Sequence, residues 1–318
     1  MNKQVIPQTI TQVITIATRK SRLALWQSEH VAAALSRLNP GLEVRLLPLS
    51  TRGDEILDRS LAEIGGKGLF LKELEKAILD GRADLAVHSL KDVPAEQPDG
   101  LALGAFLPRA NPADLWISRQ GRAIEALPEG SRVGSSSLRR ISQLRAIRPD
   151  IEVTALRGNV ETRLAAVREG RVDATILAAA GLERLGIVPE QAMALDMSSW
   201  LPAPGQGVIA IQQRSGDEAT RELISALECR VTGDQARAER EVVRVLGGDC
   251  RMPLAVHAFV EGSSMRLRAR LGDESGHLID AEAVGPTENS TDLGGNVAHA
   301  LLENGGAEIL EKLNLSQN

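Results

Sequence analysis

Two hydrophobic patterns alternate along the first part of the chain. Short runs of consecutive apolar residues are typical of buried strands, and longer segments with an apolar residue every three or four positions are typical of amphipathic helices. These patterns predict strands at 13–17, 44–49 and 83–87 and helices at 21–38 and 69–79. Because strands that alternate with helices form mainly parallel sheets with helices on their faces, we expect an α/β fold.

The same order of elements starts again near residue 132. Strands are predicted at 132–134 and 151–156, and helices at 138–147 and 160–169. A short internal repeat supports a duplication, because each copy follows a helix and leads into a polar strand end: GRADLAV at 81–87 and GRVDATI at 170–176. We therefore expect two similar α/β lobes with a cleft between them.

Two segments rich in proline and glycine, 98–112 and 201–207, are predicted to connect the lobes. A strand at 208–211 follows the second segment and returns the chain to the first lobe. Glycine and proline at these densities interrupt regular elements, which is why we place the crossovers there.

A third unit starts near residue 216. It contains, in chain order, helical segments within 218–246, strands near 255–260 and 265–271, and a last helix at about 296–313. We expect three domains, with these residues: 1–107 together with 208–225, then 108–207, then 226–318.

Composition excludes several classes of function. The 318 residues include three Phe, three Trp and no Tyr, which argues against a platform that stacks single-stranded nucleic acid. The net charge of −5 argues against a surface that binds polyanions. No apolar signal region or membrane-length stretch is visible, and five scattered histidines lack metal-ligand spacing. We expect a soluble cytoplasmic monomer without a metal, a membrane partner or a nucleic-acid partner.

The most informative segment is HSLKD at 88–92. It ends a predicted strand, and Pro94 prevents a simple continuation of strand or helix. An imidazole, a hydroxyl, an ammonium and a carboxylate are therefore expected together at a carboxyl end of a parallel strand, where α/β proteins bind ligands. A polar strand end that faces solvent is the alternative.

Arginines gather in the second lobe. Residues 131–171 hold nine arginines and four acids, within a chain that is acidic overall. Arg139 and Arg140 follow the serines of GSSSLRR at 134–140, and Arg157 and Arg163 flank a second strand-to-helix turn. Arg19 and Ser21 hold the equivalent place in the first lobe. Guanidinium groups and helix amino ends suit carboxylate or phosphate, so we expect a ligand with several such groups; a capped, solvated helix face is the alternative.

Two further loops stand out. A polar, glycine-rich passage at 50–68 lacks the phosphate-binding P-loop pattern and is interpreted as a mobile lid. Cys250 lies in the loop GGDCRMP at 247–253 beside Arg251, which favours its thiolate, so we expect a reactive or modified thiol there. Cys229 is interpreted as a buried, inert cysteine.

Together these segments resemble the porphobilinogen deaminase (hydroxymethylbilane synthase) family nearly from end to end. The resemblance rests on ATRKS at 17–21, TRGD at 51–54, GGKGLF at 65–70, HSLKDVP at 88–94, GSSSLRR at 134–140, LRGNV at 156–160, PGQG at 204–207 and GGDCRMP at 247–253. It implies two lobes like those of type 2 periplasmic binding proteins and a smaller third α/β domain that carries the cysteine loop. It also implies the reaction, in which four porphobilinogens are joined head to tail with loss of ammonia before water releases hydroxymethylbilane.

The resemblance further implies a dipyrromethane cofactor, held by a thioether to Cys250, and a catalytic role for Asp92. A carboxylate there would stabilise the methylene-pyrrole cation left by deamination and help to move protons. Because neighbours on an extended segment point to opposite sides, we expect that Lys91 does not neutralise Asp92. The residues implied to bind the cofactor are Lys91, Ser21, Arg139, Arg140 and Ser137, and those implied to bind substrate are Arg19, Arg157, Arg163, Arg184, Gln206 and Lys67. Glu63 replaces a lysine expected in some relatives, so a basic lid contact from position 63 is not expected.

Two other functions fit parts of the pattern. A two-lobed module that binds small anions without catalysis accounts for the arginines but gives Asp92 and Cys250 no task. Schiff-base chemistry at Lys91 predicts that borohydride traps a carbonyl substrate on that residue.

Overall fold

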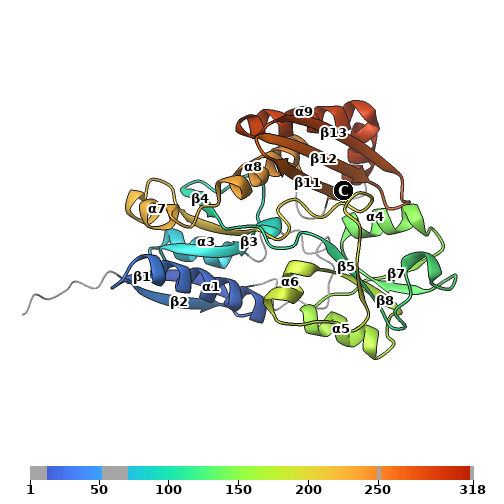
Figure 1. Cartoon of the computed structure of the whole chain (residues 1–318), viewed down its shortest axis with the longest axis horizontal. Helices are drawn as coiled ribbons and strands as arrows, with labels where there is room; N and C mark the ends of the chain where they lie inside the picture. Colours follow the sequence, from blue (N-terminus) through green and yellow to red (C-terminus); the bar gives the residue numbers. More distant parts are fainter. Residues whose placement is uncertain (1–12, 52–70, 249–251, 316–318) are drawn as a thin grey trace, which may run out of the picture.

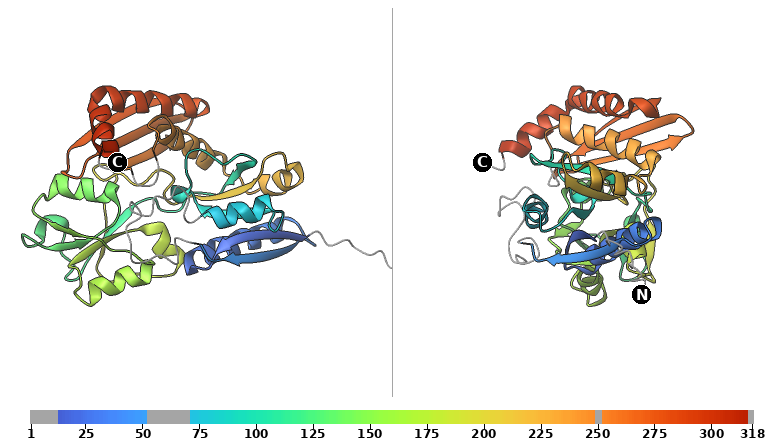
Figure 2. Two further views of the ribbon diagram at one scale, coloured as in Figure 1. Left: turned by 180° about the vertical axis from the view of Figure 1, so that it is seen from behind. Right: turned by 90° about the vertical axis from the view of Figure 1, so that its left-hand side faces the viewer.

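The computed structural model describes residues 13–51, 71–248 and 252–315. Two α/β lobes lie side by side, and a third domain lies across both of them (Figure 1). The two further views in Figure 2 show the same three-part arrangement, with the third domain on one side of the paired lobes. An α/β fold with two similar lobes and a smaller third domain is thus confirmed.

Lobe 1 is built on a five-stranded sheet of order β2-β1-β3-β10-β4, in which β1 runs parallel to β2 and β3, and β10 runs antiparallel to its neighbours. Its strands are β1 (Val13–Arg19), β2 (Glu43–Leu49), β3 (Leu85–Ser89), β4 (Leu101–Phe106) and β10 (Ile209–Arg214), and its helices are α1 (Arg22–Leu38), α3 (Lys72–Leu79) and α7 (Glu218–Ser225). Ile16 of β1 packs with Leu35 of α1, whereas Ala17 packs with Leu74 of α3. Alternate residues of β1 therefore bury helices on both faces of the sheet.

Lobe 2 repeats this design in a five-stranded sheet of order β7-β6-β8-β5-β9, with β6 parallel to β7 and β8 and with β5 antiparallel to its neighbours. Its strands are β5 (Asp114–Ser118), β6 (Arg132–Gly134), β7 (Glu152–Thr154), β8 (Ala174–Ala178) and β9 (Ala192–Ala194), and its helices are α4 (Leu138–Ile147), α5 (Val160–Arg168) and α6 (Ala179–Arg184). The fourth strand of each sheet, β10 or β5, directly follows a crossover from the other lobe. Each sheet thus contains one strand that the chain forms directly after it crosses from the other lobe.

The internal repeat has a structural counterpart. Gly81 and Gly170 both end a helix with a φ of 71°, a conformation that glycine adopts readily. Asp84 Oδ2 accepts a hydrogen bond of 2.7 Å from the backbone N–H of Thr15, and Asp173 Oδ2 accepts one of 2.9 Å from the N–H of Arg132. Each aspartate therefore ties the start of the third strand of its sheet, β3 or β8, to the neighbouring second strand, β1 or β6.

One predicted connection is shorter than expected. Residues 98–112 were interpreted as a connection, but β4 occupies Leu101–Phe106 and pairs with β10 in lobe 1. Only the residues between β4 and β5 cross to lobe 2. The glycine inside β4, Gly104, is required by packing, because an added Cβ would lie 2.6 Å from the side chain of Ile224.

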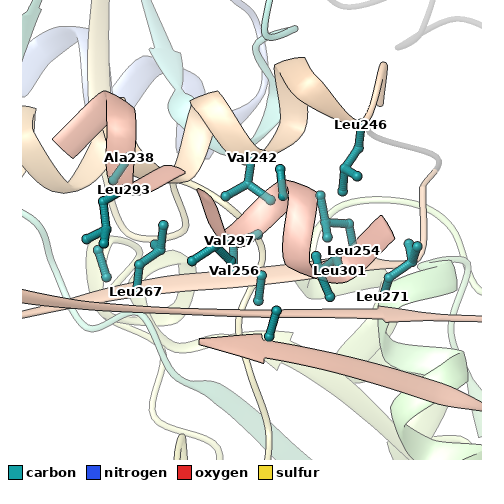
Figure 3. Close-up of a cluster of buried hydrophobic side chains, with 14 of the residues drawn as sticks. Ala238, Val242, Leu246, Leu254, Val256, Leu267, Leu271, Leu293, Val297 and Leu301 are labelled. Carbon is teal, nitrogen blue, oxygen red and sulfur yellow. The ribbon is translucent and has the colours of Figure 1, made fainter. Parts of the chain in front are cut away.

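The third domain packs two helices on one face of an antiparallel sheet of order β11-β12-β13 (Figure 3). Its main elements are α8 (Arg230–Val245), β11 (Leu254–Glu261), β12 (Ser264–Gly272), β13 (Leu278–Pro286), α9 (Ser290–Leu301) and α10 (Ala307–Leu315). Val242, Val256, Val297 and Leu301 are 0% exposed in its core. The single last helix predicted at 296–313 is wrong, because a π-helical turn with Gly305 at a φ of 109° separates α9 from α10.

Short helical turns complete the described chain: η1 (Leu90–Asp92), η2 (Ile124–Ala126), η3 (Thr287–Asn289) and η4 (Leu302–Gly306). Among the described residues, no helix is both long enough and apolar enough to span a bilayer.

Candidate active site

The polar residues singled out in the sequence lie at carboxyl ends of parallel strands in both lobes. β3 of lobe 1 leads into the turn η1, and β6 and β7 of lobe 2 lead into α4 and α5. This is the edge at which α/β sheets bind ligands. The region where these edges face one another is called the lobe junction below. It is defined by Lys91 and Asp92 of lobe 1 and by Arg139, Arg140, Arg157 and Arg163 of lobe 2.

The segment 88–92 divides into an inner and an outer half. His88 is 6% exposed and its Nε2 lies 3.1 Å from Gln212 Oε1. The pKa of the His88 imidazole is lowered to about 4, mainly by burial and also by the charge of Arg19, while the hydrogen bond with Gln212 acts in the opposite direction. Ser89 Oγ accepts a hydrogen bond of 2.8 Å from Gln27 Nε2 of α1. The expectation that all four polar groups gather at the strand end is therefore wrong for His88, which is neutral and held inside lobe 1.

Lys91 and Asp92 form the outer half. Residues Leu90–Asp92 make a 3₁₀ turn, so the extended segment assumed from the sequence is wrong. Asp92 is exposed, and Lys91 Nζ donates a hydrogen bond of 3.3 Å to Gln206 Oε1. Burial lowers the pKa of Lys91 to about 8, although the Asp92 carboxylate acts in the opposite direction. Asp92 therefore favours the charged form of Lys91 while its side chain stays exposed.

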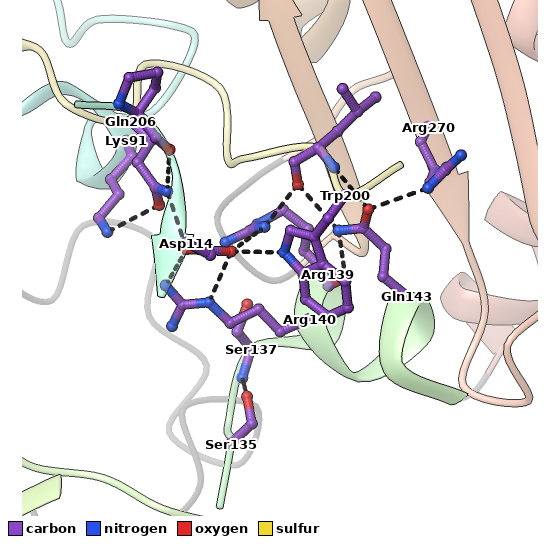
Figure 4. A network of polar contacts seen from close by, with 12 residues as sticks. Lys91, Asp114, Ser135, Ser137, Arg139, Arg140, Gln143, Trp200, Gln206 and Arg270 are labelled. Atoms are coloured by element: carbon purple, nitrogen blue, oxygen red, sulfur yellow. Dashed lines mark hydrogen bonds and ion pairs between the residues drawn. The ribbon is translucent and has the colours of Figure 1, made fainter. Parts of the chain in front are cut away.

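Asp114, at the start of β5, is the centre of a buried polar network (Figure 4). Its carboxylate accepts hydrogen bonds from Arg139 Nη1 at 2.8 Å and Arg140 Nη2 at 2.7 Å. Trp200 Nε1 at 2.9 Å and Gln206 Nε2 at 3.0 Å complete its shell. Burial raises the pKa of Asp114, but the two guanidinium groups lower it more, so the carboxyl group is ionised and its pKa lies well below the usual range.

Arg139 and Arg140 therefore already have a carboxylate partner within the chain. They are 5% and 6% exposed, and Arg139 also donates to the carbonyl of Leu201 at 2.8 Å. Two cations share one carboxylate, which leaves a net positive charge beside the lobe junction. The charges of Arg139 and Arg140 also help to lower the pKa of Lys91, so the positive charge of lobe 2 acts on a residue of lobe 1.

Gln206 connects the two lobes. It is 1% exposed and follows the second crossover. Its Nε2 donates to Asp114 Oδ1 and, at 2.6 Å, to the carbonyl of Pro112 in the first crossover, while its Oε1 accepts from Lys91. The amide thus links η1 of lobe 1 to β5 of lobe 2 through both crossover segments, as Figure 4 shows from Lys91 to Asp114.

Arg163 brings α5 into the same region. Its Nε donates a hydrogen bond of 3.0 Å to the carbonyl of Gly158. The pKa of Arg163 is lowered to about 10, mainly by burial and also by the charges of Arg140 and Arg157. The carboxylate of Asp92 acts in the opposite direction. Asp92 of lobe 1 and Arg163 of lobe 2 are therefore electrostatic neighbours across the junction.

The other residues implied by the resemblance have varied surroundings. Ser21 caps α1 by accepting from the N–H of Ala24 at 3.4 Å, and Ser137 precedes α4 as its N-terminal cap residue. Arg19 ends β1 and is partly buried. Arg184 donates to the carbonyl of Gly207 at 2.6 Å and lies 5.9 Å from the ring centroid of Trp26 in lobe 1, so it contributes to contacts between the lobes.

Part of the predicted site lies outside the described residues. Cys250 and Arg251 of the cysteine loop, and Glu63 and Lys67 of the predicted lid, belong to this part. Cys229 is described and is partly buried rather than buried; its Sγ accepts a hydrogen bond of 3.4 Å from the hydroxyl of Thr232.

Two residues of the network were missed from the sequence. Asp114 and Trp200 lie in stretches without a recognisable motif, and their role depends on partners 25 and 86 positions away along the chain. An acid directly before a short apolar run, Asp114 before LWI, is the only local signal for a buried carboxylate.

The described groups at the lobe junction suit a ligand with several carboxylates. The pKa values of Lys91 and Arg163 there depend on the charges of neighbouring residues. The cations of this group are Lys91, Arg139, Arg140, Arg157 and Arg163, and its carboxylates are Asp92 and Asp114. The pKa values of Lys91 and Arg163 are both lowered because burial disfavours their charged forms. A ligand carboxylate nearby would favour those charged forms again. Fold and site together define a two-lobed α/β protein whose lobe junction is cationic and contains the exposed carboxylate of Asp92.

The chain belongs to the porphobilinogen deaminase family. A family model described as "Porphobilinogen deaminase, dipyromethane cofactor binding domain" matches residues 14–222, and one described as "Porphobilinogen deaminase, C-terminal domain" matches residues 234–303. The chain is 53% identical over 301 residues to the porphobilinogen deaminase of Xanthomonas campestris pv. campestris strain B100, and 52% identical over 300 residues to that of Stenotrophomonas maltophilia strain K279a. Each match covers 94% of this chain and 99% of the relative.

Among solved structures, the ligand-binding component of an ABC-type import system from Staphylococcus aureus aligns with 14% identity and a TM-score of 0.43, covering 74% of this chain and 78% of that one. A score this low carries no argument about function. The family matches show an enzyme of the transferase type whose substrate is porphobilinogen and whose cofactor is dipyrromethane. A binding module without catalysis is not favoured.

Proposed function

We propose that the chain joins four porphobilinogens head to tail and releases hydroxymethylbilane. In each addition the C–N bond of the substrate's aminomethyl group breaks, ammonia leaves, and a C–C bond forms to the terminal pyrrole ring with loss of its α proton. Water then cleaves the finished tetrapyrrole from the enzyme. The observation that carries the proposal is the exposed carboxylate of Asp92, which lies opposite the cationic cluster of lobe 2.

Asp92 is proposed as the catalytic residue. Loss of ammonia leaves a positive charge that is spread over the substrate's pyrrole ring and its methylene carbon. A fixed carboxylate next to that ring stabilises the charge as it develops. It also accepts a proton from the ring nitrogen and delivers one to the leaving amine. Its exposure suits this role, because the carboxylate must meet each incoming ring in turn.

The cationic side chains are proposed to hold the acetate and propionate groups. We assign the cofactor to Lys91, Ser21, Arg139, Arg140 and Ser137, and the substrate to Arg19, Arg157, Arg163, Arg184, Gln206 and Lys67. Because Arg139, Arg140 and Gln206 are almost fully buried, their proposed contribution is to set the field and the positions of the neighbouring cations. Removing carboxylates from water is favourable only when each is paired or hydrogen-bonded, which is what this cluster supplies.

Cys250 is proposed to carry dipyrromethane through a thioether. When bound, the dipyrromethane supplies the free pyrrole carbon to which the first substrate ring is added. In the order of the chain, the cysteine loop lies between α8 and β11 of the third domain. Residues 226–318 are proposed as this cofactor-attachment domain, with residues 1–107 and 208–225 as lobe 1 and 108–207 as lobe 2.

We also propose that the protein is a cytoplasmic monomer with no membrane or nucleic-acid partner. The chemistry is tested by incubating the purified protein with porphobilinogen and measuring ammonia release against substrate consumed. One ammonia per porphobilinogen, with hydroxymethylbilane as product, is expected. Binding of porphobilinogen without ammonia release, or trapping of substrate at Lys91 by borohydride, would contradict the proposal.

A further inference from the structure

The loop that follows Asp92 is held from the third domain by one arginine. Arg240 of α8 donates hydrogen bonds to three successive backbone carbonyls, those of Val93 at 3.2 Å, Pro94 at 2.8 Å and Ala95 at 2.8 Å. These residues come directly after the proposed catalytic aspartate in the chain. The contact joins two segments about 145 positions apart, and no sequence motif predicts it.

The charge of Arg240 makes this contact expensive. Burial lowers the pKa of the guanidinium to about 10. Among the described residues, no carboxylate forms an ion pair with it, unlike Arg237 and Arg244 on the same helix, which pair with Asp234 and Glu241. A partly buried cation that is satisfied by neutral carbonyls is an unfavourable way to dock two domains, since apolar packing serves that purpose at lower free energy. The arrangement instead fixes the path of one short backbone segment.

The same turn of α8 is anchored to the crossovers. Glu239 is 0% exposed and accepts hydrogen bonds from Arg109 at 2.7 and 2.8 Å and from the N–H of Gly205 at 2.7 Å. Arg109 lies in the first crossover and Gly205 in the second. Adjacent residues of α8 thus fix the connections between the lobes and the Asp92 loop, and the helix ends at Val245, shortly before the cysteine loop.

The Asp92 loop has further supports of a different kind. Val93 lies in one buried apolar cluster with Ala236 of α8, and Gln97 Oε1 accepts a hydrogen bond of 2.9 Å from Gln212 Nε2 of β10. Within the loop, Gln97 Nε2 donates to the carbonyl of Pro94 at 3.1 Å, and the N–H of Val93 donates to the carbonyl of Leu90 at 3.0 Å. Among the described residues, Arg240 supplies the side-chain hydrogen bonds that hold the backbone of the loop to α8.

We propose that Arg240 is a positioning residue that sets where Asp92 stands relative to the domain bearing the cofactor cysteine. The inference rests on the proposed function, and Arg240 acts only through the carbonyls of residues 93–95. Without the guanidinium the loop keeps its sequence and Asp92 keeps its charge, but the carboxylate loses its fixed position beside the reacting ring. A displacement of about 1 Å in such a group can slow the chemical step by about 100-fold.

The test compares holoenzyme carrying Arg240→Gln, Arg240→Lys or the matched control Arg244→Gln, whose arginine is 55% exposed and pairs with Glu241. Dipyrromethane content by mass spectrometry, melting temperature, and kcat and KM for porphobilinogen are measured for each. For loaded Arg240→Gln we expect kcat to fall roughly 10- to 100-fold with KM within about threefold of wild type. Arg240→Lys should recover part of kcat, and the control should match wild type.

A double variant separates positioning from a general loss of structure. If Arg240 acts through Asp92, the single-turnover rate of the first ring addition in Asp92→Asn/Arg240→Gln should equal that of Asp92→Asn alone. Additive losses would overturn the inference, as would a loaded Arg240→Gln enzyme with wild-type kcat. If the wild-type protein carries no pyrrole primer and releases no ammonia, the proposed function fails instead, which the same measurements show directly.

Discussion

Replacement of Asp114 by asparagine tests the polar network at the lobe junction. Asp114 balances two guanidinium groups whose side chains are only 5% and 7% exposed. Asparagine keeps the volume of the side chain but removes the charge, and its amide N–H groups face donors instead of acceptors. Because breaking a buried ion pair costs about 3–5 kcal/mol and Asp114 has two cationic partners, we expect a loss of stability at the upper end of that range.

Intrinsic fluorescence in urea provides the assay. Trp116 and Trp200 are both buried in the core of lobe 2, so two of the three tryptophans report on this lobe. The control is Glu169→Gln in the same lobe, which breaks a pair with Arg171 in which both side chains are more than half exposed. Such surface pairs contribute about 0–1 kcal/mol, so the control should unfold almost as wild type does. A loss in Asp114→Asn no larger than in the control would refute the reasoning.

The pH dependence gives the same test a second readout. The folded-state pKa of Asp114 is lowered, so its contribution is fully present above the unfolded value of about 3.9 and is lost as pH falls below it. The difference in stability between wild type and Asp114→Asn should therefore be constant from neutral pH down to about pH 4 and shrink below that.

Three further predictions concern β3 and the turn that follows it. Asp92→Asn should fold normally, as its melting temperature will show, but add rings far more slowly in single-turnover assays; wild-type turnover would contradict its assigned role. Because the pKa of Lys91 is lowered to about 8, its interaction with the cofactor carboxylates should weaken above that pH, and the resulting alkaline limb of kcat/KM should disappear in Lys91→Met. His88 has a folded pKa of about 4 against an ordinary 6.5, so wild type should lose on the order of 3 kcal/mol as pH falls from 6.5 to 4. His88→Gln should flatten that part of the stability curve in urea titrations, and an unchanged curve would argue against a buried neutral imidazole.

Elements with strong local patterns were predictable. The helix predicted at 138–147 has the bounds of α4, and the seven-residue repeat correctly paired the starts of β3 and β8. β13 was missed because it is an edge strand with only one buried residue, Ala281, so its sequence lacks an apolar run. β4 was missed because the glycines and prolines around it outweighed its short apolar run.

Motifs single out candidate site residues but not the network that those residues form. Local motifs indicate Asp92 and the arginines as candidates, because these residues stand in short recognisable patterns. They could not show that Arg139 and Arg140 point at Asp114, or that Arg240 reaches the carbonyls that follow Asp92. Such contacts depend on how separate domains dock, and no local propensity encodes them.

The central claim, that this chain extends a pyrrole primer held on Cys250, is tested most directly by mass spectrometry. Intact and peptide masses of the purified protein should show a dipyrromethane adduct on the peptide that contains Cys250. If the protein is purified without its cofactor, the adduct should appear after incubation with porphobilinogen. A Cys250 peptide that carries no pyrrole mass after that incubation would contradict the account.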